Sequence, residues 1–295
     1  MSRVKTISMI LVVLVFLGAA TVGLRWFFGI EKPAALELPK TAQESTNPAD
    51  AKAVSAQSLP NHVRREVGKS FTFARGSELR PPGDPSVWID SLKGAAERGD
   101  AEASYSIYLA LMDCDMYLKA SSPEELQQSR SIGAAPQYEQ TVLRKLTECA
   151  SLDASDMSQI GLWLTKAASQ GSIEAQVAYA ASPNRILGTE PDEKSEQFRE
   201  WQGNAIAYLH EAMLKGSIDA LANLSNSYMA GVITSRDPIR AYASQLALNE
   251  INPNFSSENY RREIAKELSP AQIHRAQELS KKFFTDVTKD AGALQ

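Results

Sequence analysis

The sequence has few of the residues that enzymes most often use for chemistry. Its 295 residues include 2 cysteines and 3 histidines. The histidines, His62, His210 and His274, are far apart, and none has a neighbour at the spacing of a metal site. The sequence lacks Cys-x-x-Cys, a phosphate-binding glycine loop and Gly-x-Ser-x-Gly. It therefore predicts no catalytic, cofactor-binding or metal-binding residues, and we expect a protein that is not an enzyme.

Positive charge is scarce in the C-terminal two thirds of the chain. Residues 86–295 carry 20 Lys and Arg against 28 Asp and Glu, whereas residues 1–85 carry 11 against 7. An acidic domain repels the phosphate backbone of nucleic acids. This charge distribution excludes nucleic acid as the expected partner.

Long hydrophobic runs are confined to the N-terminus. The 19 residues from Thr6 to Leu24 carry no charge, and Trp-Phe-Phe follows Arg25. At about 1.5 Å per residue this run nearly spans a hydrocarbon core of roughly 30 Å. We expect a transmembrane signal anchor over residues 6–30, with residues 1–5 in the cytoplasm and the bulk of the chain exported. The alternative is a signal peptide cleaved after Ala20.

Residues 31–85 differ in composition from the segments on either side. Prolines interrupt a stretch rich in Ala, Ser, Thr, Glu and Gln, which predicts a flexible, disordered linker. Within it, residues 61–80 carry several basic residues around Phe71 and Phe73. The basic residues are Arg64, Arg65, Lys69, Arg75 and Arg80. We expect a solvated linker with a local charge run here. The alternative is a segment that docks on an acidic surface, of which the acidic domain of the same chain is one candidate.

Three segments of the domain repeat one pattern around a glycine. Aligned on that glycine, each has a leucine seven residues before it, an alanine four before and an alanine four after. The positions that define the three units are Leu92, Ala95, Gly99 and Ala103; Leu164, Ala167, Gly171 and Ala175; and Leu209, Ala212, Gly216 and Ala220. Steps of three and four place these residues on one face of a helix on each side of the glycine.

The glycine marks a break between two helices. It supplies the left-handed conformation that ends the first helix. The next residue is Asp100, Ser172 or Ser217, each a good N-cap, and an acid follows in the first turn at Glu102, Glu174 or Asp219. A helical hairpin cannot bury its apolar face alone, so the hairpins must stack. The pattern predicts an all-α solenoid over residues 86–295.

The spacing of the glycines is uneven. The steps are 72 and 45 residues, whereas tetratricopeptide-type hairpins repeat at about 34. We interpret the longer step as two units, with a degenerate unit whose remnant is the helix 136–150. The shorter step is one unit with an insertion at residues 182–196. Residues 112–135 fit no unit.

The repeated Leu-x-x-Ala-Ala-x-x-Gly-x-x-x-Ala pattern resembles the Sel-one-like repeat, a tetratricopeptide-related α-solenoid family common in exported bacterial proteins. Tyr228, Gly231, Asp237 and Ala241 are similar to its second half, and residues 268–284 resemble its capping helix, with Ser269, Pro270 and Gln272 forming the helix start. The resemblance implies a non-catalytic interaction scaffold or adaptor in the bacterial periplasm. It would be tethered to the inner membrane as a single-pass protein, and its partner would be another envelope protein. The alternative from another class is an enzyme, or an enzyme-like binder, that acts on cell-wall compounds.

Other residues have two interpretations each. Asp113 and Asp115 bracket Cys114, and we expect them to be solvated, the alternative being contact with a cation. Five aromatic residues are expected to pack between units, the alternative being a ligand groove: Tyr105, Tyr108, Tyr117, Trp163 and Trp201.

The two cysteines, Cys114 and Cys149, both lie in the segment expected to be exported, and this count predicts one disulfide. The alternatives are buried free thiols or a redox pair.

Overall fold

The computed structural model describes residues 62–119, 127–128, 130–133 and 136–289. All of these belong to one compact unit, Ala56–Gln295. The predicted cytoplasmic N-terminus, the predicted anchor over residues 6–30 and the first part of the predicted linker lie outside the described residues. Within the described ranges the chain is mostly helical, and none of these helices has both the length and the hydropathy needed to cross a membrane.

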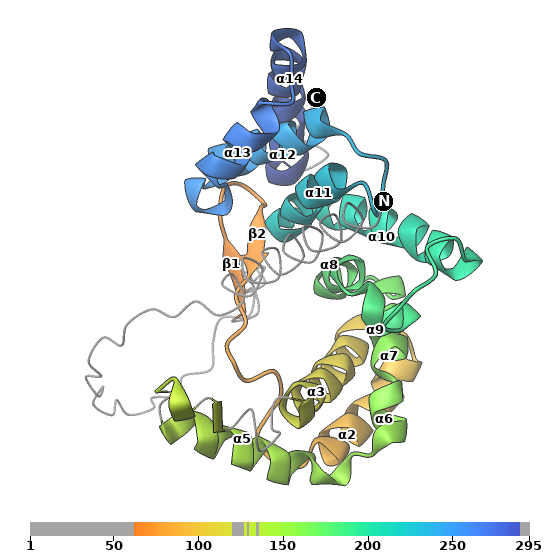
Figure 1. Ribbon diagram of the computed structural model, residues 1–295. Helices are drawn as coiled ribbons and strands as arrows, with labels where there is room; N and C mark the ends of the chain where they lie inside the picture. Colours follow the sequence, from red (N-terminus) through yellow and green to blue (C-terminus); the bar gives the residue numbers. More distant parts are fainter. Residues whose placement is uncertain (1–61, 120–126, 129, 134–135, 290–295) are drawn as a thin grey trace, which may run out of the picture. The chain divides into compact units, whose positions relative to one another are not determined.

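Four helical hairpins follow one another along the described chain. Their helices are α2 (Pro85–Glu97) with α3 (Ala101–Lys119), α7 (Ile160–Ser169) with α8 (Ile173–Ala181), α10 (Glu196–Leu214) with α11 (Ile218–Ala230), and α12 (Pro238–Ile251) with α14 (Pro270–Thr288). Each helix in this order packs against the next, so the hairpins form one stacked array (Figure 1). The described part of the chain is thus consistent with the predicted solenoid.

The first three hairpins turn at the predicted glycines. Gly99, Gly171 and Gly216 have φ values of 98°, 99° and 104°, a region that residues with a Cβ rarely adopt. The predicted N-caps after them are also confirmed: the side chain of Ser172 accepts from the N–H of Ala175, and Ser217 caps α11 in the same way. The sequence around each glycine therefore ends one helix and starts the next.

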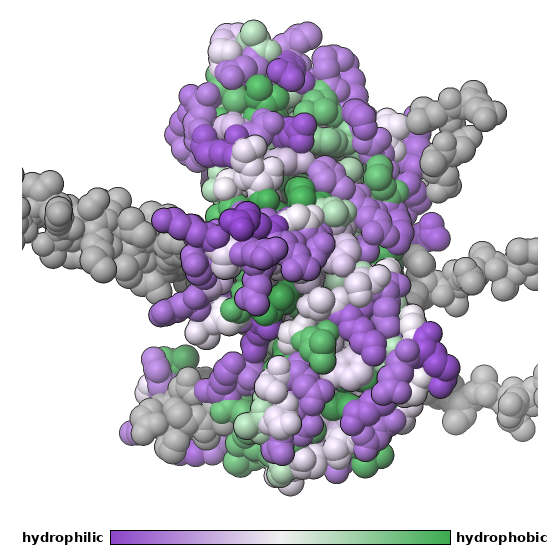
Figure 2. Space-filling view, turned by 90° about the vertical axis from the view of Figure 1, so that its right-hand side faces the viewer, coloured by the Kyte–Doolittle hydropathy of each residue, from purple (hydrophilic) through white to green (hydrophobic). Residues whose placement is uncertain are grey.

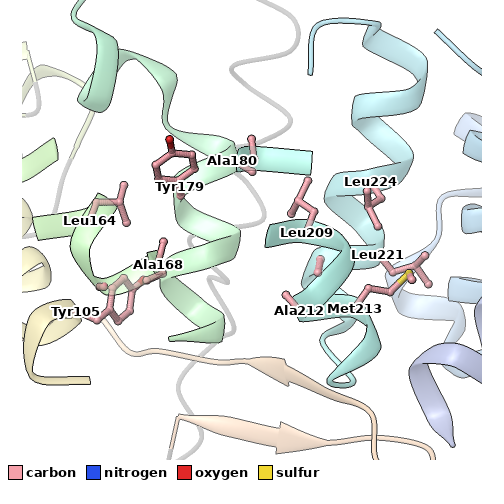
Figure 3. Close-up of a cluster of buried hydrophobic side chains, with 14 of the residues drawn as sticks. Tyr105, Leu164, Ala168, Tyr179, Ala180, Leu209, Ala212, Met213, Leu221 and Leu224 are labelled. Atoms are coloured by element: carbon pink, nitrogen blue, oxygen red, sulfur yellow. The ribbon is translucent and has the colours of Figure 1, made fainter. Parts of the chain in front are cut away.

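The alanine and leucine positions of the repeats lie between the helices. Ala167, Ala175, Ala212 and Ala220 are fully buried, as are Leu164 and Leu209, and Ala103 is nearly so. Figure 3 shows Leu164 of α7 and Leu209 and Ala212 of α10 in the buried cluster, together with Tyr179 of α8 and Leu224 of α11. Leu92 and Ala95, in the first hairpin, are only partly buried, because among the described residues no earlier hairpin covers that side of α2.

The segment between the first two hairpins corrects the expected repeat count. It contains α5 (Pro136–Glu148), the short 3₁₀ helix η1 (Cys149–Ser151) and α6 (Ala154–Ser158). Helix α3 packs directly against α7, and α5 lies against α3 beside the array. No degenerate unit is therefore stacked between them. The reason lies in the narrow face that α5 buries. Its fully buried residues are Val142 and Lys145, followed by Cys149 in η1, too few to separate two helices.

The predicted insertion and the predicted C-terminal cap are both present. Helix α8 ends at Ala181, and the short α9 (Pro183–Leu187) follows it and packs against α7. Near the C-terminus come η2 (Pro253–Phe255) and α13 (Glu258–Ala265), and then α14, which begins with the predicted capping box of Ser269 and Gln272. The face of the molecule shown in Figure 2 is mainly hydrophilic, with hydrophobic residues in small separate groups.

Residues 62–84 correct the predicted linker boundary. They contain an antiparallel hairpin, β1 (Val63–Arg65) and β2 (Phe71–Phe73), in which Arg64 pairs with Thr72. The hairpin packs on α11, and the chain then runs along the array to α2 (Figure 1). The folded domain thus begins no later than His62. The docking alternative is the one that the structure bears out for Lys69, Arg75 and Arg80, whose side chains contact carbonyl groups and acidic side chains of the array, whereas Arg64 and Arg65 are exposed.

Candidate functional site

An extended segment of the chain lies across the turns of the helical hairpins. We call residues 62–80 the strap. It meets the array at the edge formed by the glycine turns. The second and third hairpins contact it through the acid in the first turn after each glycine, Glu174 and Asp219. The equivalent acid of the first hairpin, Glu102, is exposed and acts on the strap through its charge. We call these acids, Glu102, Glu174 and Asp219, the acidic row. Each acid stands three residues after the glycine of its hairpin, so all three occupy the same position in the first turn of their helices.

The strap is bonded to the third hairpin as an added strand. The N–H of Phe71 donates to the carbonyl of Gly216 over 2.9 Å, and Phe71 forms a parallel bridge with Ser217. The carboxylate of Asp219 accepts from the N–H of Phe73 at 2.9 Å and from the hydroxyl of Thr72 at 3.0 Å. Burial raises the pKa of Asp219, and these two hydrogen bonds oppose that rise.

The second hairpin holds an arginine of the strap. The guanidinium of Arg75 donates to both carboxylate oxygens of Glu174, at 2.6 and 2.7 Å, and lies 5.6 Å from the centre of the Tyr105 ring. Such bidentate pairs are about twice as strong as neutral hydrogen bonds. The exposed fractions of these side chains are 24% for Arg75 and 13% for Glu174, so the pair is largely shielded from water.

His62 completes this contact. Its Nε2 lies 3.4 Å from Glu174 and 3.2 Å from the guanidinium of Arg75. Burial and the charge of Arg75 lower the pKa of His62, against the opposing effect of Glu174 and Glu102. Burial would also lower the pKa of Arg75, but Glu174 outweighs it and raises that pKa, with a smaller contribution from Glu102. The acidic row therefore favours a cation at position 75, whereas burial and Arg75 disfavour protonation of His62.

The start of the strap is held at the C-terminal end of the array. The N–H of Lys69 donates to the carbonyl of Thr288 at 2.9 Å, and its ammonium donates to the carbonyl of Leu214 at 2.5 Å. Glu66 accepts from the side-chain amide of Asn252. Gly68 is required here, because a Cβ at this position would lie 2.2 Å from the Thr288 carbonyl oxygen.

The end of the strap enters a buried ion cluster. The side chains of Arg80, Asp113 and Lys145 have exposed fractions of 0%. Asp113 lies 3.0 Å from Nε of Arg80 and 2.8 Å from the ammonium of Lys145, and Arg80 also pairs with Glu148 at 2.9 Å. The Arg80–Asp113 contact is an ion pair without the alignment of a hydrogen bond, and Oδ1 of Asp113 has no hydrogen-bond partner. Glu78 lies 2.8 Å from Lys145.

The predicted disulfide is confirmed and lies next to this cluster. Cys114 of α3 is bonded to Cys149 of η1, with their Cα atoms 5.6 Å apart. Nη2 of Arg80 lies 3.6 Å from Sγ of Cys149. The covalent bond and the ion cluster together attach α5 to α3, where stacked-hairpin packing is absent. The free-thiol alternative is therefore wrong for this structure.

The expectation that Asp113 and Asp115 are solvated is wrong. Both are buried within α3, Asp113 in the ion cluster and Asp115 against Lys119 and Arg185. Burial would raise the pKa of Asp115, but hydrogen bonds from Arg185 and Lys119 lower it. The sequence interpretation failed because Arg80, Lys145 and Arg185 come from distant segments, which local spacing does not reveal. Lys119 alone is close in sequence, one helical turn from Asp115.

The aromatic residues pack as expected. Tyr105, Tyr108, Trp163 and Trp201 belong to the buried core, while Tyr117 is partly buried with the Lys145 ammonium 5.7 Å from its ring centre. Among the remaining histidines, His210 lies 3.3 Å from the hydroxyl of Tyr228, and His274 is exposed on α14. No group of three or more metal-ligating side chains occurs within the described ranges.

Comparison with known proteins identifies no family. No family model matches the chain, and no curated protein matches it either. Among solved structures, the chain is similar to a protective antigen present in uropathogenic Escherichia coli strains that displays an SLR fold. The identity is 21% and the TM-score 0.35, over 68% of this chain and 41% of that protein. The chain thus spans less than half of that protein, and a likeness at this level assigns no function.

Proposed function

We propose that this chain is a non-catalytic protein-interaction scaffold built on Sel-one-like repeats. The observation that carries the proposal is the strap. The array holds an extended polypeptide across successive hairpins, with the N–H of Phe71 on Gly216, the N–H of Phe73 on Asp219 and Arg75 on Glu174. Main-chain hydrogen bonds combined with one side-chain specificity contact are the usual means by which proteins bind extended peptides.

The titratable groups at this edge support binding over catalysis. Glu174, Arg75 and His62 satisfy one another, and Asp219 is satisfied by the strap. Groups arranged for general acid or base catalysis must instead reach a substrate proton. The charged groups of the ion cluster are likewise directed at one another inside the fold.

The location of the scaffold is part of the proposal. We infer a single-pass inner-membrane protein of a bacterium, anchored by residues 6–30, with the repeat domain in the periplasm. The support is the uncharged run from Thr6 to Leu24 and the basic residues Arg3 and Lys5 before it. The Cys114–Cys149 disulfide adds support, because disulfides persist in oxidising compartments such as the periplasm.

The test is chemical crosslinking of the full-length protein in its own membranes, followed by purification and identification of attached proteins. Membranes that lack the protein serve as the control. We expect one or more envelope proteins that are specifically recovered. Failure to recover any protein, together with turnover of a cell-wall fragment by the purified chain, would contradict the scaffold proposal.

A further inference from the structure

We propose that the acidic row is the partner-binding edge of the array, and that the strap is its resident occupant. A partner would bind by placing an extended, arginine-containing segment of its own on this edge in place of the strap. The inference rests on the proposed scaffold function and specifies its surface and the chemistry of its ligand.

The first argument concerns which strap groups make the contacts. The N–H groups of Phe71 and Phe73 point to the array, as expected for alternate residues of an extended chain. Any extended segment carries equivalent N–H groups, so these contacts do not depend on sequence. The selective contact is the bidentate pair between Arg75 and Glu174, beside the ring of Tyr105. A lysine offers no planar fork for this carboxylate.

The second argument concerns what remains when the strap leaves. The rings of Phe71 and Phe73 contact each other edge to face, and His62 stacks on Phe73. Neither phenylalanine belongs to the hydrophobic core of the array. In Figure 3 the two strands run past the ends of the helices, outside the buried cluster. Release of residues 71–75 from this edge uncovers the carboxylates of Glu174 and Asp219 and the carbonyl of Gly216. Leu79 and Arg80, at the end of the strap, pack on the core and in the ion cluster and need not leave with them.

The third argument is electrostatic. Residues 86–295 carry an excess of acidic residues, and three of these acids, the acidic row, lie along one edge. The row stabilises a positive charge on the strap: Glu174 raises the pKa of Arg75, although burial alone would lower it. A basic segment is attracted to this edge and an acidic one is repelled. The partner segment must therefore carry net positive charge.

The strap lowers the apparent affinity of such a partner without changing the site. Because it is part of the same chain, it is present at a high effective concentration. The apparent affinity equals the intrinsic affinity multiplied by the fraction of molecules in which the edge is free. A change that weakens the strap alone should therefore strengthen binding of a separate segment.

The experiment uses the full-length protein in detergent at about 150 mM salt and a fluorescent peptide of residues 69–77, with anisotropy as the readout. In the variant Arg75→Ala the strap loses its pair with Glu174, whereas the peptide keeps its own arginine. We expect the peptide to bind Arg75→Ala at least tenfold more tightly than the wild type. Adding Glu174→Gln should remove that gain, and the matched control Glu193→Gln, an exposed acid before α10, should preserve it.

A peptide with arginine replaced by lysine should bind at least tenfold more weakly, and one with glutamate should not bind. Equal binding to the wild type, Arg75→Ala and the Glu174→Gln double variant would overturn the inference, because it would show unspecific charge attraction. No binding to Arg75→Ala, with the Phe71 and Phe73 amides freely exchanging, would also overturn it. If those amides stay protected even in Thr72→Ala/Arg75→Ala, the side-chain contacts with Glu174 and Asp219 do not control release of the strap, and the inference fails.

These outcomes are separate from those of the crosslinking experiment. Peptide binding, with no recovered protein and with turnover of a cell-wall fragment, would leave the chemistry of the edge established and contradict the scaffold function. A recovered protein whose crosslinks survive Glu174→Gln would support the scaffold and refute this binding edge.

Discussion

Replacing Asp113 with asparagine perturbs the centre of the buried ion cluster. Asp113 is the carboxylate shared by Arg80 and Lys145, and all three side chains are fully buried. Asparagine keeps the size of the side chain and removes its charge. Two cations then remain in the interior, with Glu148 at 2.9 Å from Arg80 and Glu78 at 2.8 Å from Lys145 as their remaining acids.

The magnitude follows from what is left unpaired. Removing one partner of a buried ion pair costs about 3–5 kcal/mol. We expect a loss near the lower end, about 3 kcal/mol, because each cation keeps one acid. For a domain of this size, about 2–4 °C of melting temperature is lost per kcal/mol, which gives a decrease of roughly 6–12 °C.

Lys145→Met is the matched comparison. It removes a cation, leaves Asp113 paired with Arg80 and fills the space with an unbranched apolar chain. We expect it to cost about 1 kcal/mol or less, since apolar replacements of buried ions are often close to neutral. Residues 31–295, expressed without the predicted anchor, should fold independently and serve for thermal and urea unfolding followed by circular dichroism. If both variants lose the same stability, or Asp113→Asn loses almost none, the assignment of Asp113 as the shared counter-charge is refuted.

Three further outcomes are expected. Replacing Cys114 and Cys149 by serine should lower the melting temperature and leave the helical signal, because closing a loop of this length stabilises the folded state by roughly 3–4 kcal/mol. Two free thiols in the unfolded, unreduced protein would disprove the bond. Gly216→Ala should speed hydrogen exchange in the strap, because its Cβ would lie 2.9 Å from the Lys69 carbonyl oxygen. Gly171→Ala, with a similar φ and no such neighbour, should not. Equal effects of the two variants would count against the contact between the strap and the Gly216 turn. Burial and Arg75 lower the folded-state pKa of His62, against the opposing effect of Glu174 and Glu102. The contribution of His62 to folding stability is therefore present above about pH 6.5 and is lost as the pH falls. Strap protection should therefore weaken between pH 7 and pH 5, and less so in His62→Gln.

The repeats could be read from the sequence because their signals are local. Gly171 and Gly216 need a left-handed backbone, and the serine after each caps the next helix. Both requirements act within a few residues, so the pattern of residue types reveals them directly. The capping box of Ser269 and Gln272 was predictable for the same reason.

The strap and the ion cluster depend on contacts between distant residues. Thr72 and Asp219 are 147 positions apart, and Arg75 and Glu174 are 99 apart. Composition suggested a linker for this segment, since its prolines and polar residues cannot build a core of their own. The basic residues around Phe71 were the available signal for docking, and an acidic domain was the available surface. What the sequence did not contain was the register that places Arg75 on Glu174.

The expected degenerate unit at 136–150 failed for a related reason. A helical pattern predicts a helix but not its neighbours, and α5 is indeed a helix. The narrow buried face of Val142 and Lys145 lets it lie against α3 without entering the stack. Its position is held by the disulfide and the ion cluster instead of by repeat packing.

Hydrogen exchange at the amides of Phe71 and Phe73 tests most directly whether the acidic row holds an extended segment. Both amides donate to the array, one to the Gly216 carbonyl and the other to the Asp219 carboxylate. We predict slow exchange of both in the full-length protein, and fast exchange when Glu174→Gln and Asp219→Ala are combined, with the amides of α7 unchanged. Exchange of Phe71 and Phe73 at the rate of an unstructured peptide in the wild type would contradict the account.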